Sequence, residues 1–155
     1  MQAEPRRVIV PVMRSLSRRT LLMGAAWPVA RAQEGIIDIH QHAPYSGRTA
    51  DELVEHQKTM GITKTILLTA GSRFGLAAGV APNDASVELA RRFPKRYYFF
   101  ANELPGIPET RRVLEKYLRM GAIGIGEQKF PVECDSRHIQ LVAEIAQEFG
   151  VFLHQ

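Results

Sequence analysis

From residue 36 onward, the chain alternates short apolar segments with amphipathic segments, and this alternation is the strongest constraint on its fold. The apolar segments have the length of strands and span 36–42, 64–70, 97–102, 122–130 and 151–154. The segments between them have apolar residues at helical spacing and span 50–60, 84–93, 108–120 and 136–149. Strands that are apolar nearly throughout are typical of a parallel sheet covered by helices. We therefore predict an α/β protein with five strands and four helices.

Two architectures fit this alternation. A closed (βα)8 barrel of the TIM type needs about 250 residues, and the 155-residue chain provides about half of them beyond residue 32. An open doubly wound sheet could form from five strands alone. Polar residues recur at the carboxyl ends of the first, fourth and fifth strands, where barrel enzymes carry their sites. We therefore expect a partial TIM-type barrel over residues 33–155, with the open sheet as the alternative.

The first 32 residues are typical of a cleavable export signal. The apolar run Leu21–Ala30 follows a basic region and is too short to cross about 30 Å of hydrocarbon as a helix. The run leads into Ala30-Arg31-Ala32, the small-x-small pattern that is typical of a signal cleavage site. The segment Ser17–Leu22 resembles the twin-arginine class of signal. We predict export to a bacterial periplasm, with a basic leader of no targeting role as the alternative.

The charge of the chain is concentrated in this leader. The chain has a formal charge of +4, and the first 32 residues contain six arginines and one glutamate, so the remainder has a formal charge of −1. The basic isoelectric point therefore gives no reason to expect nucleic-acid or membrane partners for residues 33–155. Cys134 is the single cysteine, which excludes a disulfide within the chain.

Two histidines end the first strand. Side chains alternate along a strand, so His40 and His42 are expected to point the same way, with Cα atoms roughly 6–7 Å apart. Imidazole is the commonest metal-ligand side chain, and this spacing suits one shared cation. Asp38 has the same parity and could accept a ring N–H from a ligand histidine, although a structural role fits equally well.

Two charged residues lie near the end of the fourth predicted strand. Glu127 and Lys129 have the same parity, so both would face one side of the sheet. Burying such charges without partners costs several kcal/mol each, which favours mutual pairing or contact with a metal. Glu127 could be a ligand or could orient one, and Lys129 could bind substrate or a carboxylate. An ion pair at the rim with no catalytic part is the alternative.

Together these motifs resemble those of the amidohydrolase-related family of metal-dependent barrel hydrolases. The resemblance rests on Ile37–His42, Gly124–Phe130 and Val151–His154, in this order and spacing, and covers the N-terminal half of a family member. It implies that His40, His42 and His154 bind a divalent metal, with zinc expected, and that Glu127 is a further ligand. Lys129 is the expected catalytic residue, and the expected partner is a small-molecule substrate.

The resemblance also implies residues that this sequence does not contain. Family members generally have an aspartate at the end of strand eight and often a histidine on strand six, so we expect residues 33–155 to be inactive alone. A second copy or a C-terminal half could then pair with the exposed strand edges. The expected activity is hydrolysis of an amide, ester or lactone carbonyl. Metal-dependent decarboxylation, or a non-catalytic exported α/β domain, are the alternatives.

Overall fold

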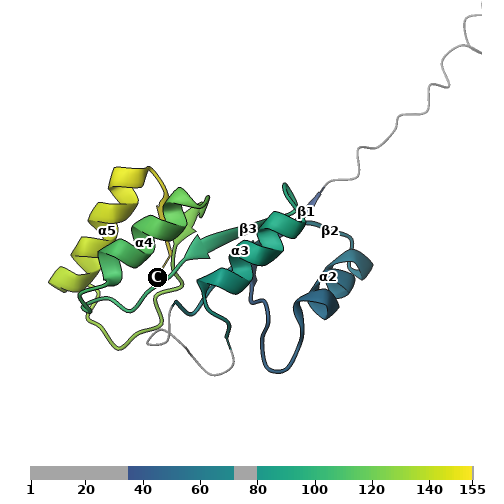
Figure 1. The fold of residues 1–155 in the computed structure, drawn as a ribbon, viewed down its shortest axis with the longest axis horizontal. Coiled ribbons are helices and arrows are strands. Elements are labelled where there is room, and N and C mark those ends of the chain that lie inside the picture. The colour runs from purple at the N-terminus through teal and green to yellow at the C-terminus, as the bar shows by residue number, and fades with distance from the viewer. Residues whose placement is uncertain (1–34, 72–79, 155) are drawn as a thin grey trace, which may run out of the picture. The chain divides into compact units, whose positions relative to one another are not determined.

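The computed structural model describes residues 35–71 and 80–154, which belong to a compact unit spanning Glu34–Gln155. The predicted export signal lies outside the described residues. The elements, shown in Figure 1, are β1 (Ile36–Gln41), α2 (Ala50–Thr59), β2 (Ile62–Leu67), α3 (Asn83–Arg92), β3 (Tyr97–Ala101), α4 (Thr110–Arg119), β4 (Gly124–Ile125), α5 (Arg137–Phe149) and β5 (Phe152–Leu153). None of the described helices combines the length and the apolar character that crossing a membrane requires.

The five strands form one parallel sheet in the order β1-β2-β3-β4-β5. Each strand pairs with the next one along the chain, and the sheet curls into a half-barrel. A doubly wound sheet would instead reverse its strand order at a switch point. The expected α/β fold with a partial TIM-type barrel of about five strands and four helices is therefore confirmed, and the open-sheet alternative is wrong.

Polar capping residues and a glycine mark several of the helix ends. Thr49 and Glu52 form a reciprocal capping box at the start of α2. Ser136 caps α5 through a hydrogen bond from the Ile139 amide, and Gly150 ends that helix in the left-handed conformation. These signals agree with the predicted helices, whose observed bounds differ by only a few residues.

The helices cover one face of the curled sheet. Tyr97, Phe99 and Ala101 of β3 belong to the buried core, together with apolar residues from α2, α3, α4 and α5. In Figure 1, α3 lies along β3 and α4 lies beside α5, in agreement with their contacts. The alternate residues Tyr98 and Phe100 are outside this cluster because strand side chains alternate between faces. The sheet therefore has a helix-covered outer face and a separate inner face.

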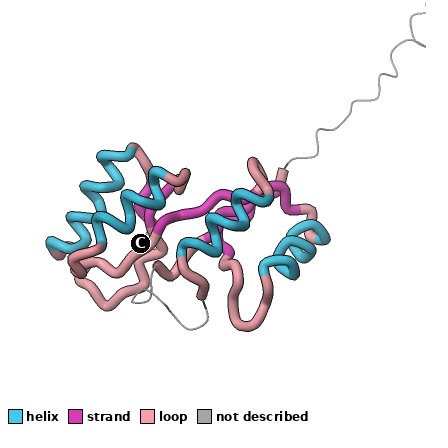
Figure 2. Tube along the Cα trace, viewed as in Figure 1, coloured by secondary structure: helices cyan, strands magenta, loops and turns pink. Residues whose placement is uncertain are grey.

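Two strands end at least three residues earlier than the sequence predicts, and the other three end one residue earlier. β4 comprises only Gly124–Ile125, whereas the prediction extended to residue 130, and Figure 2 shows loop from there to α5. The reason is Gly126, whose φ of 129° leaves the range of strand backbone. The strand predicted over 64–70 is β2, which begins at Ile62 and ends at Leu67. Beyond it, the Ala70 amide bonds the Ala81 carbonyl in a loop.

An irregularity in β1 changes which of its residues share a face. Asp38 pairs with Thr65 and Gln41 pairs with Leu67, so three steps along β1 match two steps along β2. Such a bulge breaks the alternation of side chains between faces. Asp38 accordingly bonds Gln57 of α2 on the helix-covered side. The expectation that Asp38 and His40 face the same side is therefore wrong.

The core predicts a clear stability effect at Leu114. This α4 residue is fully buried in the cluster that joins the helices to the sheet. Leu114→Ala removes buried methyl groups and leaves a cavity, and we expect the free energy of unfolding to fall by about 2–5 kcal/mol. Urea unfolding followed by circular dichroism measures the change. The exposed Met60 is the control, because Met60→Ala should change stability by no more than about 0.5 kcal/mol.

Candidate metal centre

Three side chains from three strand ends converge on the inner face of the half-barrel. His40, Glu127 and His154 each offer a ligand atom, and these atoms all lie within 4.8 Å of one another. His40 Nε2 is 3.4 Å from Glu127 Oε2. The ring centroids of His40 and His154 are 6.3 Å apart. The structure therefore brings together three of the four residues that the sequence analysis expects to bind a metal.

Parallel pairing explains why these residues meet although His40 and His154 are more than a hundred positions apart. His40 lies near the end of β1, Glu127 follows β4, and His154 follows β5 directly. The carboxyl ends of parallel strands meet at one edge of a sheet, where barrel enzymes carry their sites. Phe100 of β3 lies beneath this edge, with its ring 6.4 Å from that of His154. Phe100 is buried and places an apolar ring beside His154.

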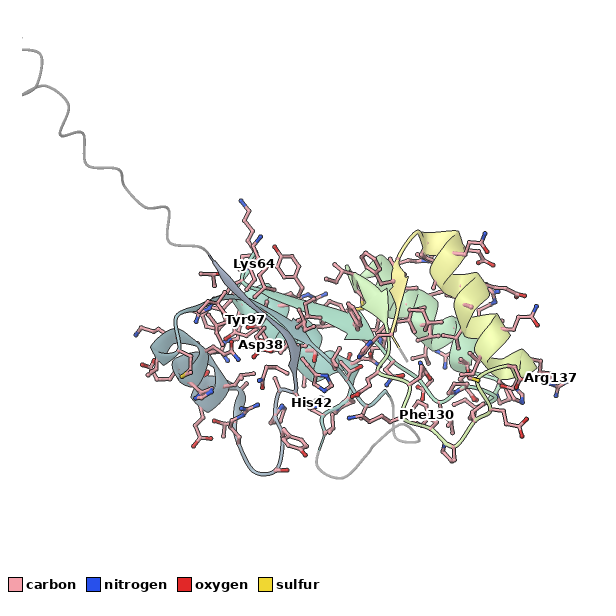
Figure 3. All side chains as sticks on the ribbon, turned by 180° about the vertical axis from the view of Figure 1, so that it is seen from behind. Asp38, His42, Lys64, Tyr97, Phe130 and Arg137 are labelled. Atoms are coloured by element: carbon pink, nitrogen blue, oxygen red, sulfur yellow. The ribbon has the colours of Figure 1, made fainter. Side chains whose placement is uncertain are left out.

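His42 lies beside this group but is not one of its three members. Its ring centroid is 5.2 Å from that of His40, and its Nδ1 is 2.9 Å from the Leu68 carbonyl oxygen. A carbonyl oxygen can only accept, so Nδ1 must donate, and Nε2 of neutral His42 then has a free lone pair. Metal-binding histidines are commonly oriented in this way. Figure 3 shows His42 at the carboxyl end of β1, beyond Asp38.

Glu127 and Lys129 form an ion pair next to the histidines. Lys129 Nζ is 2.7 Å from Glu127 Oε2, the same oxygen that lies nearest to His40. The side chain of Glu127 is 15% exposed and that of Lys129 is 61% exposed, so water screens the lysine more than the glutamate. The two residues meet in the loop after β4, not through the alternation of a strand. The expectation of shared strand parity is wrong, whereas the expected pairing is present.

The protonation of His40 follows from its surroundings. Burial lowers the pKa of His40 and outweighs the neighbouring Glu127 carboxylate, which raises it. The positive charge of Lys129 lowers the pKa of His40 further. The neutral imidazole is therefore favoured, and this is the form that offers a lone pair to a cation.

The spacing and chemistry of the donors suit a divalent cation such as zinc. Ligand atoms that lie about 2.0–2.1 Å from a tetrahedral zinc ion are about 3.4 Å from each other. The distance from His40 Nε2 to Glu127 Oε2 has this value. Two imidazoles and one carboxylate are also a donor set that zinc enzymes use, with the fourth position left for water or substrate. The chemistry of the donors is therefore compatible with such an ion, and one of their distances matches tetrahedral geometry.

Asp38 does not orient a histidine ring. Its carboxylate accepts hydrogen bonds from the side chains of Gln41 and Gln57 and from the His40 amide. Burial opposes the ionised form, but these hydrogen bonds outweigh it and lower the pKa of Asp38. Gln57 in turn accepts from the buried Thr65 hydroxyl. Of the two roles left open for Asp38, the structure supports the structural one, which ties β1 to α2 and β2.

The sequence analysis missed two residues that hold the site. The Asn102 side chain donates to the Glu127 carbonyl oxygen at 2.7 Å. A Cβ atom at position 126 would contact the His154 carbonyl oxygen, so only glycine allows this approach. The sequence contains a signal for each residue. Asn102 is a polar residue directly after an aromatic strand, and Gly126 directly precedes the expected ligand Glu127.

Comparison of the chain with models of known families and with curated proteins gave no match.

The approach of Gly126 to His154 predicts a position-specific effect. A strained backbone alone is expected to lower the free energy of unfolding by about 1–3 kcal/mol. Gly126→Ala should lower it by more than this, because the added methyl group meets the His154 carbonyl. It should also shift the amide NMR resonance of His154. Gly121 is the matched control, since its φ is 104° and a Cβ there would meet nothing within 4 Å. Equal losses in the two variants, with an unshifted His154 resonance, would contradict the interpretation.

Proposed function

We propose that this chain binds a divalent metal, zinc being the expected ion, and that the centre serves hydrolysis of an amide, ester or lactone carbonyl. The observation that carries the proposal is the convergence of His40, Glu127 and His154 at the carboxyl edge of the half-barrel. Two further features support it. The resemblance of the three motifs to amidohydrolase-related proteins predicts this ligand set, and the hydrogen bond of His42 leaves its Nε2 available as a fourth donor.

Each side chain has a distinct part in this proposal. A divalent ion at such a centre polarises a carbonyl and lowers the pKa of water, which supplies a nucleophile near neutral pH. His40 and His154 would bind as neutral donors, and Glu127 would reduce the net charge of the centre. Lys129 is the proposed catalytic residue, because its ammonium group lies beside Glu127 and is exposed enough to reach a substrate oxygen. It could stabilise negative charge that develops on that oxygen.

The electrostatics are compatible with exchange of the lysine for a metal. Without an ion, Lys129 and His40 both approach Oε2 of Glu127. Lys129 is long and exposed, so an ion pair of this kind contributes only about 0–1 kcal/mol. A divalent cation attracts the carboxylate more strongly and can displace the ammonium group from it. The displaced lysine would then remain at the rim, next to the position of a substrate.

Metal binding tests the proposal directly. Isothermal titration of the full chain with Zn²⁺ should give one binding site. His40→Ala or His154→Ala should lower the zinc affinity by about 100-fold or more. Even the residues that only orient metal ligands change metal affinity by about 10–100-fold. His56→Ala is the control, because His56 is exposed on α2 and should leave the affinity unchanged. Zinc affinity that does not differ between the wild type and a His40→Ala, His154→Ala double variant would refute the site.

Activity is a separate test. Any hydrolysis of a panel of esters, lactones and amides by the full chain should disappear with a chelator and return with Zn²⁺. Lys129→Ala should lower kcat while leaving zinc affinity within a few-fold of the wild type. Release of carbon dioxide from aromatic acids, without hydrolysis, would instead support the decarboxylase alternative. Metal binding without either reaction would limit the proposal to the centre itself.

A further inference from the structure

A buried polar network joins the carboxyl ends of three neighbouring strands beneath the metal centre. It consists of Thr69 after β2, Asn83 at the start of α3, Asn102 after β3 and Gln128 after β4. Asn102 is its hub and is only 2% exposed. Polar groups in such a position are costly unless they are hydrogen-bonded, so the network has a specific geometry.

Every polar atom of Asn102 has a partner. Its Nδ2 group donates to the carbonyl oxygens of Thr69, at 2.8 Å, and Glu127, at 2.7 Å. Its Oδ1 accepts from Gln128 Nε2 at 2.9 Å. Its main chain is held by Asn83, which accepts from the Asn102 amide at 2.9 Å and donates to the Asn102 carbonyl at 2.8 Å. An asparagine side chain has two amide protons and one carbonyl oxygen, and all of them are used here.

Two of these bonds restrain the residue that offers the carboxylate. Glu127 follows Gly126, where the chain leaves β4. Within this loop, its carbonyl oxygen accepts a local hydrogen bond from the Lys129 amide at 3.1 Å. Asn102 holds that carbonyl from β3 and also holds the side chain of Gln128, the next residue. Asn102 therefore restrains the peptide unit between Glu127 and Gln128 from β3, as a clamp of two hydrogen bonds. The same unit is also held by the bond from the Lys129 amide and by the Gln128 amide, which donates to the His154 carbonyl.

We propose that Asn102 is a positioning residue that holds Glu127 at the spacing a metal ligand needs. The inference rests on the proposed function, because it concerns the same centre. Asparagine alone among residues of this size combines two amide donors with an acceptor, so aspartate, leucine or serine cannot make all three bonds. Asn102 itself touches no substrate and no ion, and it acts only through the backbone of Glu127 and the side chain of Gln128.

The test is Asn102→Asp, which keeps the shape of the side chain but loses both N–H donors. We expect Zn²⁺ affinity to fall by about tenfold or more. We also expect the visible absorption of the Co²⁺-loaded protein to change, because a displaced ligand alters the coordination geometry. Amide order parameters from NMR should fall at Glu127 and Gln128 and remain unchanged in the helices.

Thr110→Val is the matched control for a general loss of stability. The Thr110 hydroxyl is fully buried and donates to the Leu104 and Ile107 carbonyls, but it has no bond to the loop after β4. This variant should be destabilised while its zinc affinity, cobalt spectrum and order parameters at Glu127 stay unchanged. If Asn102→Asp does not fold, Gln128→Met removes one bond of the clamp and should lower the same order parameters and the affinity by several-fold.

The outcomes separate the two proposals. A wild-type chain that binds no zinc refutes the proposed function, and the order parameters at Glu127 then decide by themselves whether Asn102 holds that loop. Zinc binding that is equal in the wild type and Asn102→Asp, with unchanged order parameters, overturns the positioning role. An equal loss of affinity in Thr110→Val also overturns it, because the effect would then follow stability and not the clamp.

Discussion

Parallel pairing of each strand with its successor is the constraint on which the rest of the structure depends. It places all carboxyl ends at one edge of the curled sheet, so His40, Glu127 and His154 meet although they are far apart in the chain. The same topology directs the helices to the opposite face, where Leu114 and its neighbours form the core. The hydrophobic core and the candidate centre therefore occupy different faces of the same strands.

The candidate centre is held by backbone contacts more than by its own side-chain contacts. Gly126 allows the segment after β4 to approach the His154 carbonyl, and Asn102 holds the carbonyl of Glu127. Leu68 likewise orients the His42 ring through its carbonyl oxygen. Most of these contacts come from strand ends or from the loops directly after them. A small change in the path of the loop after β4 would therefore move a potential ligand without disturbing the core.

Opposite charges are paired at the candidate centre. Lys129 pairs with Glu127, and the surroundings of His40 favour its neutral form. A divalent cation would enter a site whose imidazoles are already suited to donate and whose carboxylate is held by an exposed, weakly bound lysine. Under the proposed function, the ion pair of Glu127 with Lys129 and the metal site would share the Glu127 carboxylate.

The alternation of apolar and amphipathic segments was sufficient to predict the α/β class and the number of elements, because these depend on local periodicity. The three residues of the candidate centre were expected from the resemblance of their motifs to a family and from the carboxyl-end rule. Only the tertiary structure determined which residues share a face near Asp38, where β4 ends and what holds Glu127. The bulge in β1 depends on its register with β2, and the early end of β4 accompanies the positive φ of Gly126 at its close approach to His154. The role of Asn102 depends on contacts with residues 19 to 33 positions away, which no local pattern encodes.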